Sequence, residues 1–292
     1  MLFNSCAASC WLEQGGPVKK VAVILLNWNG WRDTVACLHS LRQLDYPAAQ
    51  MLVVDNASSD DSVAQIGKAM PGIAVLQTGA NLGFGGGCNA GLRQAMAQGA
   101  DYLWLVNSDA VADPSALSAL VAKAESDGRL GAVGSVLYET EAPGSVQLWG
   151  GGQVNLWTGQ SRHRLRPGPL DFISGASVLL RRSALEQVGL FDSPRYFMYW
   201  EDTDLHFRLR KAGWRFAVAD NSRLWHKQSA SLGRNSPALD RYFTQSGVRF
   251  FKRHAPYPFI PISFMVGKML AKRIVTGEWQ RARAVLKGLR SA

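Results

Sequence analysis

The stretch YLWLVNSDA, residues 102–110, predicts a buried β-strand that runs straight into a polar corner. Apolar residues fill 102–106, Asn107 and Asp109 follow, and a helix is expected to open at Pro114. Such a strand delivers its polar end to the carboxyl edge of a sheet, where open α/β sheets bind ligands. Asn107 and Asp109 lie on the same side of an extended chain and offer two hard oxygens, which suit a divalent cation on a diphosphate. The alternative is that Asp109 caps the turn before the helix.

Three other apolar runs show the same pattern of strand, loop and helix. They cover residues 21–27, 51–54 and 73–77; the first two end in clusters of Asn and Asp, and the third leads into a glycine-rich loop at 81–91. Strands that alternate with helices indicate βαβ units and a mostly parallel sheet. We therefore expect three clusters of Asn and Asp, including the one at Asn107, on one edge of this sheet.

After the Pro114 helix the pattern loosens into short strands among glycines, which indicates a mixed, antiparallel addition that shapes one side of the site. The aromatic segment 196–200 then leads into a helix that is expected to run to Lys211 and end at Gly213 as its C-cap. Further on, His226 follows an apolar pair, and a lone histidine of this kind is more often structural than a ligand.

The start of that helix is acidic and carries Glu201, Asp202 and Asp204. Acidic residues in a first turn complement the helix dipole, which accounts for Glu201 and Asp204. Asp202 lies about one turn before Leu205 on the inner side of the helix, so its carboxylate is a candidate for chemistry.

The chain has 292 residues, 47% of them hydrophobic and 18% charged, which suits one large globular domain with an appendage. Its four cysteines show no metal-ligand spacing, and we expect reduced thiols in a cytosolic protein. Residues 1–20 lack the basic and apolar regions of a signal peptide, so we expect a loose extension and a fold that starts near Val21.

The net charge of +10 is concentrated at the C-terminal end. From Lys252 onward, nine Lys and Arg stand against Glu278 alone, and the rest of the chain is nearly neutral. A basic tail indicates a local anionic partner, either a membrane surface or a nucleic acid. Residues 259–270 are apolar but too short and too charged to span a bilayer, and the alternating basic and apolar residues beyond them suit an anionic membrane surface. The alternative is a basic helix that packs on the domain.

The glycine-rich loop formally contains a dinucleotide-binding fingerprint, Gly85-x-Gly87-x-x-Ala90. This pattern keeps a nicotinamide-dependent oxidoreductase open as an alternative, beside a nucleic-acid-binding protein that uses the basic tail. Against the first alternative, the loop belongs to the third strand rather than the first, and Asp109 lies three residues beyond its strand rather than at its end. A flexible backbone that approaches a diphosphate or a sugar accounts for the same glycines.

Taken together, these pieces resemble the family 2 glycosyltransferases of the GT-A fold, in particular the bacterial rhamnosyltransferase-like members. The matching segments are residues 23–30, 53–60, 81–85, 105–109 and 200–205, with Arg208 and Gly213. The resemblance implies an α/β GT-A nucleotide-diphospho-sugar transferase fold with a mostly parallel central sheet flanked by helices. It also implies a division into an extension at 1–20, the transferase domain at 21–235, and a helical, basic C-terminal segment at 236–292.

The resemblance implies roles for single residues as well. Asp55 contacts the nucleotide base, Asp109 binds Mg²⁺ or Mn²⁺ on the donor diphosphate, and His226 matches a further metal ligand. Asn107 departs from the family's common Asp-x-Asp, so metal affinity without donor should be weak. Asp202 matches the general base of an inverting displacement. The expected donor-binding set is Asn27, Asn29, Asp55, Asn56, Asn81, Gly83, Phe84, Asn107 and Asp109; the acceptor-binding set is Tyr199, Trp200 and Glu201; and the metal set is Asp109, Asn107 and His226.

The sequence therefore predicts an inverting, metal-dependent glycosyltransferase in cell-surface polysaccharide synthesis. Its expected donor is a nucleotide-diphosphate sugar, with dTDP-rhamnose as the leading candidate and UDP-sugars next. Its expected acceptor is a hydroxyl of a glycan or a lipid-linked glycan. We expect a cytoplasmic protein, peripheral at the inner face of the cytoplasmic membrane through its basic tail, and no nucleic-acid partner.

Overall fold

The computed structural model describes residues 18–227 and 236–292, so most of the extension expected at 1–20, and the expected domain boundary near 235, lie outside the described residues. The strands are β1 (Val21–Asn27), β2 (Ala49–Asp55), β3 (Ala74–Gln77), β4 (Tyr102–Asn107), β5 (Ala110–Ala112), β6 (Leu130–Glu139), β7 (Val146–Trp149), β8 (Gly151–Asn155), β9 (Gln160–His163), β10 (Phe172–Ile173), β11 (Ser177–Arg181) and β12 (Arg215–His226). The helices are α1 (Trp31–Leu41), α2 (Ser62–Ala69), α3 (Gly83–Ala97), α4 (Ala116–Glu125), α5 (Arg182–Val188), α6 (Glu201–Lys211), α7 (Pro237–His254), α8 (Phe259–Val275) and α9 (Trp279–Arg290).

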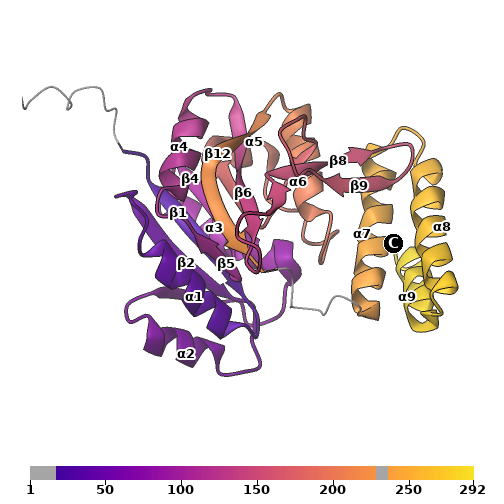
Figure 1. The fold of residues 1–292 in the computed structure, drawn as a ribbon, viewed down its shortest axis with the longest axis horizontal. Helices are drawn as coiled ribbons and strands as arrows, with labels where there is room; N and C mark the ends of the chain where they lie inside the picture. Colours follow the sequence, from indigo (N-terminus) through magenta and orange to yellow (C-terminus); the bar gives the residue numbers. More distant parts are fainter. Residues whose placement is uncertain (1–17, 228–235) are drawn as a thin grey trace, which may run out of the picture.

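The first half of the sheet is parallel, as the alternation of strands and helices predicts. β3, β2, β1 and β4 lie side by side in that order, and all run in the same direction (Figure 1). In this register Asn27 pairs with Asp55, and Leu26 pairs with Asn107. The three polar strand ends therefore meet on one edge, which confirms the expectation from the sequence.

Helices cover both faces of this sheet, which is why its central strands are apolar throughout. Alternate residues of β1 point to opposite faces: Val23 joins the core beneath α1, α2 and α4, and Ile24 joins the core beneath α3, α5 and α6. Both side chains are fully buried.

The second half of the sheet is mixed. β11 runs antiparallel to both β4 and β6, β12 runs parallel to β6, and β5 closes the edge antiparallel to β12. A small separate sheet of β10, β8 and β9 stands beside it. Residues 215–226 form one strand with an irregular step between Ala219 and Arg223. The expected mixed addition is confirmed.

The glycine-rich segment differs from its prediction. Gly85 and Gly87 lie within α3 and are buried, rather than forming an open loop. A Cβ on Gly87 would lie 2.4 Å from the side chain of Leu26, and one on Gly91 would lie 2.7 Å from Ile24. These glycines therefore let α3 pack closely against β1.

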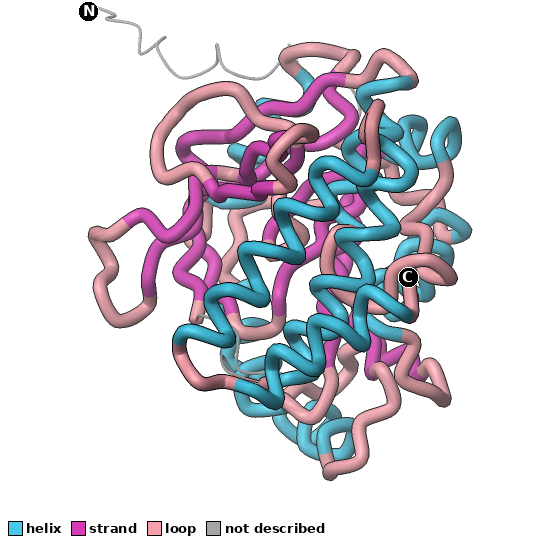
Figure 2. Tube along the Cα trace, turned by 90° about the vertical axis from the view of Figure 1, so that its right-hand side faces the viewer, coloured by secondary structure: helices cyan, strands magenta, loops and turns pink. Residues whose placement is uncertain are grey.

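The C-terminal segment is helical, as expected, and stands on the side of the molecule away from β1 and β2 (Figure 1). α7 carries Phe250 and Phe251, which are fully buried and pack around Trp200 at the start of α6. α8 and α9 pack side by side against α7 and face the viewer in Figure 2. Among the described residues, no helix combines the length and the apolar character needed to cross a membrane.

Candidate active site

Asp55 ends β2 in a rigid cradle. Its carboxylate is buried and accepts hydrogen bonds from Asn27 Nδ2 at 2.8 Å, from the Ser58 amide at 3.0 Å and from Ser58 Oγ at 2.6 Å. Asn29 holds the same loop, because its Oδ1 accepts the Ser59 amide at 2.7 Å. An open pocket beside Asp55 is lined by Ala57, Ser58, Asp60, Gln77 and Gly79. Asp55 is thus fixed in the wall of an open pocket.

Asn56 and Asn81 hold the loop before α3. The buried Asn56 donates from Nδ2 to Asn81 Oδ1 and to the Gly83 carbonyl, both at 3.1 Å, and accepts the Leu82 amide at 3.0 Å. The Gly83 amide donates to Asn81 Oδ1 at 2.9 Å, and the Phe84 amide donates to the carbonyl of Phe197 at 3.0 Å. These contacts connect the loop before α3 to the segment that leads into Asp202. They involve four of the predicted donor-binding residues, which are Asn56, Asn81, Gly83 and Phe84.

Asp109, in the turn between β4 and β5, faces His226 at the end of β12, the strand that pairs with β5. Asp109 Oδ1 lies 3.1 Å from His226 Nε2, and Asn107 Nδ2 lies 3.1 Å from the same nitrogen. On the far side of the ring, His226 Nδ1 lies 2.7 Å from Gln147 Oε1. Gln147 is itself oriented, because its Nε2 donates to Glu139 Oε2 at 3.1 Å and to the His226 carbonyl at 3.0 Å.

This arrangement fits a divalent cation. Gln147 Oε1 can only accept, so His226 Nδ1 donates to it, and Nε2 is the ring nitrogen left to face Asp109 and the Asn107 amide. Two lone-pair atoms at 3.1 Å repel unless a proton or a cation lies between them. Gln147 then acts as the partner that fixes the ring of a ligand histidine. Within residues 18–227 and 236–292, no group of three or more His, Cys, Asp or Glu gathers around one point, so the chain alone makes a sparse ligand set.

Asp113, rather than Asp109, makes the hydrogen bonds that cap the turn before α4. Asp113 accepts hydrogen bonds from the Ser115 amide at 2.9 Å and from Ser115 Oγ at 2.7 Å, immediately before α4. These bonds lower the pKa of the Asp113 carboxyl, the side-chain bond more than the backbone bond. Asp109 is left to face His226.

Asp202 lies in the first turn of α6, and its side chain reaches the loop between β10 and β11. Its Oδ1 accepts the Thr203 amide at 2.6 Å, and its Oδ2 accepts the Gly175 amide at 3.1 Å. A Cβ on Gly175 would lie 3.1 Å from the Phe84 ring, so Asp202, Gly175 and Phe84 share one corner of the site. Oδ2 takes only this one hydrogen bond and keeps a lone pair for a proton.

The residues before Asp202 adopt an uncommon backbone. Tyr199 and Trp200 both have positive φ, 67° and 69°, which is rare for bulky side chains and is maintained by the surrounding packing. The Trp200 ring is 5% exposed and packs among phenylalanines of α7, which leaves little of it for a sugar. Glu201 is also buried, its Oε2 has no hydrogen-bond partner, and burial raises its pKa well above the usual value, with the charge of Asp202 adding to the effect. The acceptor-binding roles of Tyr199, Trp200 and Glu201 stay predictions.

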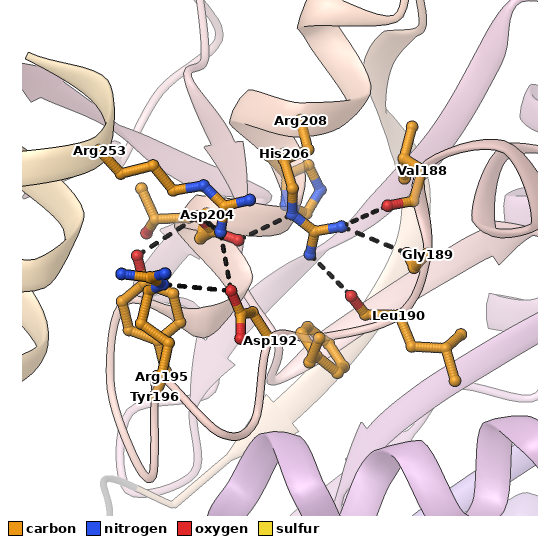
Figure 3. Close-up of polar contacts among 12 residues, drawn as sticks. Val188, Gly189, Leu190, Asp192, Arg195, Tyr196, Asp204, His206, Arg208 and Arg253 are labelled. Carbon is orange, nitrogen blue, oxygen red and sulfur yellow. Dashed lines mark hydrogen bonds and ion pairs between the residues drawn. The ribbon is translucent and has the colours of Figure 1, made fainter.

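A buried ionic network holds α6 in place (Figure 3). Asp204 is fully buried, and its carboxylate pairs with Arg208 Nε at 2.8 Å, with His254 Nε2 at 2.8 Å and with Arg253 Nη1 at 3.1 Å. Arg208 extends the network to the carbonyls of Val188 and Leu190, both at 2.7 Å. Since Arg253 and His254 belong to α7, this network fixes the helix that carries Asp202 against the C-terminal segment.

Two participants in the site have no signal in the sequence. Gln147 and Gly175 occupy ordinary-looking strands and loops, and only the folded sheet brings them to His226 and Asp202. Each depends on contacts between segments far apart in the chain.

Comparison of the sequence and the fold with known proteins finds glycosyltransferases. The family model for glycosyl transferase family 2 matches residues 22–189. The N-acetylglucosaminyl-diphospho-decaprenol L-rhamnosyltransferase of Mycobacterium tuberculosis is 32% identical over 250 residues, which cover 76% of this chain and 81% of the relative. The mannosyltransferase PcManGT from Pyrobaculum calidifontis, in complex with GDP-Man and Mn²⁺, aligns with a TM-score of 0.59 at 18% identity, over 97% of this chain and 77% of that one. GalNAc-T7 with UDP, GalNAc and Mn²⁺ has a TM-score of 0.60 at 13% identity, over 80% of this chain and 48% of that one.

The fold and the polar edge of its sheet define a glycosyltransferase of the GT-A class. The chain belongs to glycosyl transferase family 2, because the family model matches more than half of its length. Family membership confirms the resemblance seen in the sequence and removes the oxidoreductase alternative. The glycines that had suggested a dinucleotide fingerprint are helix-packing residues instead.

Proposed function

We propose that this protein is an inverting, metal-dependent glycosyltransferase that moves a sugar from a nucleotide-diphosphate donor to a hydroxyl of a glycan or lipid-linked glycan. The single observation that carries the proposal is the meeting of a fixed Asp55, the Asp109–His226 pair and the Asp202 carboxylate around one edge of the sheet. L-Rhamnose from dTDP-rhamnose is the leading donor candidate, supported by the 32% identity to a rhamnosyltransferase, and UDP-sugars come next.

In this proposal Asp55 recognises the base of the donor. Three hydrogen bonds from Asn27 and Ser58 hold its carboxylate, and Oδ2, which accepts only one of them, keeps a lone pair for an N–H of a pyrimidine. Because the bonds are already formed in the free protein, little ordering is required when donor binds.

Asp109 and His226, with Asn107 beside them, are the residues that would hold Mg²⁺ or Mn²⁺. When bound, such a cation neutralises charge that develops on the departing diphosphate. The sparse protein ligand set supports an ion that binds together with the donor rather than before it. Both solved structures described above contain Mn²⁺, which supports the choice of ion without fixing it.

Asp202 is the proposed general base. The acceptor hydroxyl gives its proton to Asp202 Oδ2 while its oxygen attacks the anomeric carbon and the bond to the diphosphate breaks on the opposite side. This single displacement inverts the anomeric centre. The Gly175 amide, which donates to Oδ2 at 3.1 Å, keeps the carboxylate aimed at the site.

A thermal-shift panel tests the proposal. Donor binding to the native state should raise the melting temperature with dTDP-rhamnose plus Mn²⁺, and less with either alone. Asp109→Ala should abolish both the Mn²⁺-dependent shift and transfer, whereas Asn107→Ala should leave a measurable remainder, because a carboxylate holds a hard cation better than an amide. Normal transfer by Asp109→Ala in excess EDTA, or no shift with any nucleotide sugar, would contradict it.

We further propose that the acceptor is carried on a lipid and that the protein works at the inner face of the cytoplasmic membrane. The support is the chemistry in the name of the 32% identical relative, which acts on a diphospho-decaprenol-linked sugar. Transfer to a lipid-linked acceptor but not to a soluble glycan of the same sequence would bear this out, and the reverse preference would contradict it.

A further inference from the structure

The outward side of α8 is apolar where a solvated helix would be charged. The four most exposed large hydrophobic side chains among residues 18–227 and 236–292 are Val275, Phe259, Phe264 and Trp279, at 86%, 68%, 61% and 60% exposure. All four lie in α8 or at the start of α9. Single exposed apolar residues are normal on protein surfaces, but a concentration of the largest ones in one place marks an interaction site.

Helical spacing groups these residues. Phe264 and Val275, about three turns apart, fall on one side of α8, the buried Met265 and Val266 turn away from that side, and Ile274 is exposed on the neighbouring side. On α9, Trp279 and Leu286 share the outward side in the same way. α8 and α9 lie side by side toward the viewer in Figure 2, so their outward sides belong to one surface.

The charges on this surface are positive and unpaired. Lys268 and Lys272 flank the apolar residues of α8, are exposed, and make no ion pair with any described residue. The same holds for three cations of α9, which are Arg283, Lys287 and Arg290. We call the outward residues of both helices the α8–α9 face; they are Phe259, Phe264, Lys268, Lys272, Ile274, Val275, Trp279, Arg283, Leu286, Lys287 and Arg290.

Two arginines of the same segment have a different role. Arg273 and Arg281 turn inward and pair with the buried Asp240, at 2.9 and 2.5 Å, and with Glu278, at 2.9 and 2.6 Å. Glu278, which is the only acidic residue after Lys252, is therefore neutralised within the fold. The α8–α9 face is left with cations alone.

We propose that the α8–α9 face binds the surface of an anionic lipid bilayer. Aromatic and aliphatic side chains enter the boundary between headgroups and acyl chains, and flanking lysines reach the anionic headgroups, as in helices that lie in a membrane interface. The unpaired cations require a partner with negative charge. The exposed side chains of Phe259, Phe264 and Val275 require that the partner also has an apolar layer.

Two other occupants fit less well. A second copy of the chain, joined through the same face, would set Lys268 and Lys272 against like charges with no carboxylate to offset them. A nucleic acid would meet phenylalanine and valine where such interfaces place polar and basic groups. Both occupants are outcomes of the test below.

This proposal deepens the proposed function, because a lipid-linked acceptor would be met at the same membrane. Cutting the chain before α8 would not test it cleanly, because Met265, Val266 and Val285 belong to the core that surrounds Trp200. The structure instead allows surface substitutions that leave that core intact.

Flotation of the full-length protein with liposomes provides the test. The wild type should float with equimolar phosphatidylglycerol and phosphatidylcholine and stay behind with phosphatidylcholine alone. Lys268→Glu/Lys272→Glu should weaken binding by about thirtyfold or more, the scale for two neutralised surface cations. Phe264→Ser/Val275→Ser should weaken it comparably by removing apolar insertion. A matched control, Val111→Ser/Lys123→Glu, changes an exposed valine and an exposed lysine elsewhere and should float like the wild type.

Four outcomes of these experiments would overturn the proposal, and two of them point to a different partner. The proposal is overturned if the wild type fails to float with anionic vesicles, or if both α8 variants float as it does. It is also overturned if sedimentation shows a dimer that the α8 variants break, or if those variants lose salt-dependent RNA binding instead of lipid binding. Far-UV circular dichroism confirms that the variants are folded. The thermal shift given by the nucleotide-sugar donor with Mn²⁺ is measured in parallel, so a failure of lipid binding is distinguished from a failure of the proposed transferase.

Discussion

Gly83→Ala tests whether the position of the segment before Asp202 depends on the start of α3. Gly83 has φ of +72°, and a Cβ there would lie 2.0 Å from the carbonyl oxygen of Phe197. The same carbonyl accepts the Phe84 amide at 3.0 Å. Substitution therefore strains the backbone and also forces the loop and the Phe197 segment apart by about 1 Å or more, the gap needed to restore ordinary contact.

The magnitude follows from two contributions. A non-glycine residue at positive φ costs about 1–2 kcal/mol, partly offset by the smaller entropy of the unfolded chain. Loss of the hydrogen bond between Phe84 and Phe197 adds roughly 1–3 kcal/mol if the groups stay buried. We expect unfolding free energy to fall by about 3 kcal/mol in total and turnover to fall on the order of tenfold to a hundredfold, because Asp202 is displaced with the segment.

Gly72→Ala is the matched control. Gly72 has a similar φ, +84°, but nothing lies within 4 Å of the position that a Cβ would take there, so only the backbone strain remains. Urea unfolding followed by circular dichroism, with initial transfer rates at saturating donor, compares the two variants. Equal losses of stability and equal rates in Gly83→Ala and Gly72→Ala would refute the coupling between the two segments.

Three further predictions follow from single contacts. Asp240→Ala should lower the unfolding free energy by about 3–5 kcal/mol in urea titration, because it leaves Arg273 and Arg281 without their shared buried carboxylate; a loss below about 1 kcal/mol would contradict this. The raised pKa of Glu201 means that the folded protein keeps a proton which the unfolded chain releases above its ordinary pKa of 4.5, so this residue's contribution to stability falls as pH rises toward the raised value. Glu201→Gln should remove that fall, by up to about 1.4 kcal/mol per pH unit, and parallel stability curves for the two proteins would contradict the assignment. Asn107→Asp should tighten Mn²⁺ binding in the absence of donor, measured by titration calorimetry, because it adds a carboxylate beside Asp109 and His226; an unchanged affinity would argue against metal binding there.

Much of the fold follows from local sequence, because its strands are continuous apolar runs with polar ends. β1, β2 and β4 end at Asn27, Asp55 and Asn107, and these positions depend only on where the hydrophobic pattern stops. The start of α6 at Glu201 and the positive φ of Gly213 after it are equally local features.

Other features depend on packing between distant segments. The glycines of α3 look like a flexible loop in the sequence, yet Gly87 and Gly91 are needed because β1 passes within contact distance. The sequence places Trp200 in the expected acceptor-binding set, but only the fold shows that α7 covers its ring. Arg273 and Arg281 turn inward because they bind Asp240, more than thirty residues earlier in the chain. The positive charge on the surface of the C-terminal segment is therefore smaller than its count of Lys and Arg indicates.

The central claim is that Asp202 acts as the general base of an inverting transfer, and Asp202→Asn tests it most directly. This variant preserves the shape of the side chain and removes its basicity. The measurement is turnover at saturating donor, with the anomeric configuration of the product read by NMR. We predict a loss of turnover on the order of a hundredfold or more, donor affinity that stays near the wild-type value, and a product of inverted configuration from the wild type. Near-normal turnover in Asp202→Asn, or retention at the anomeric carbon, would contradict the account.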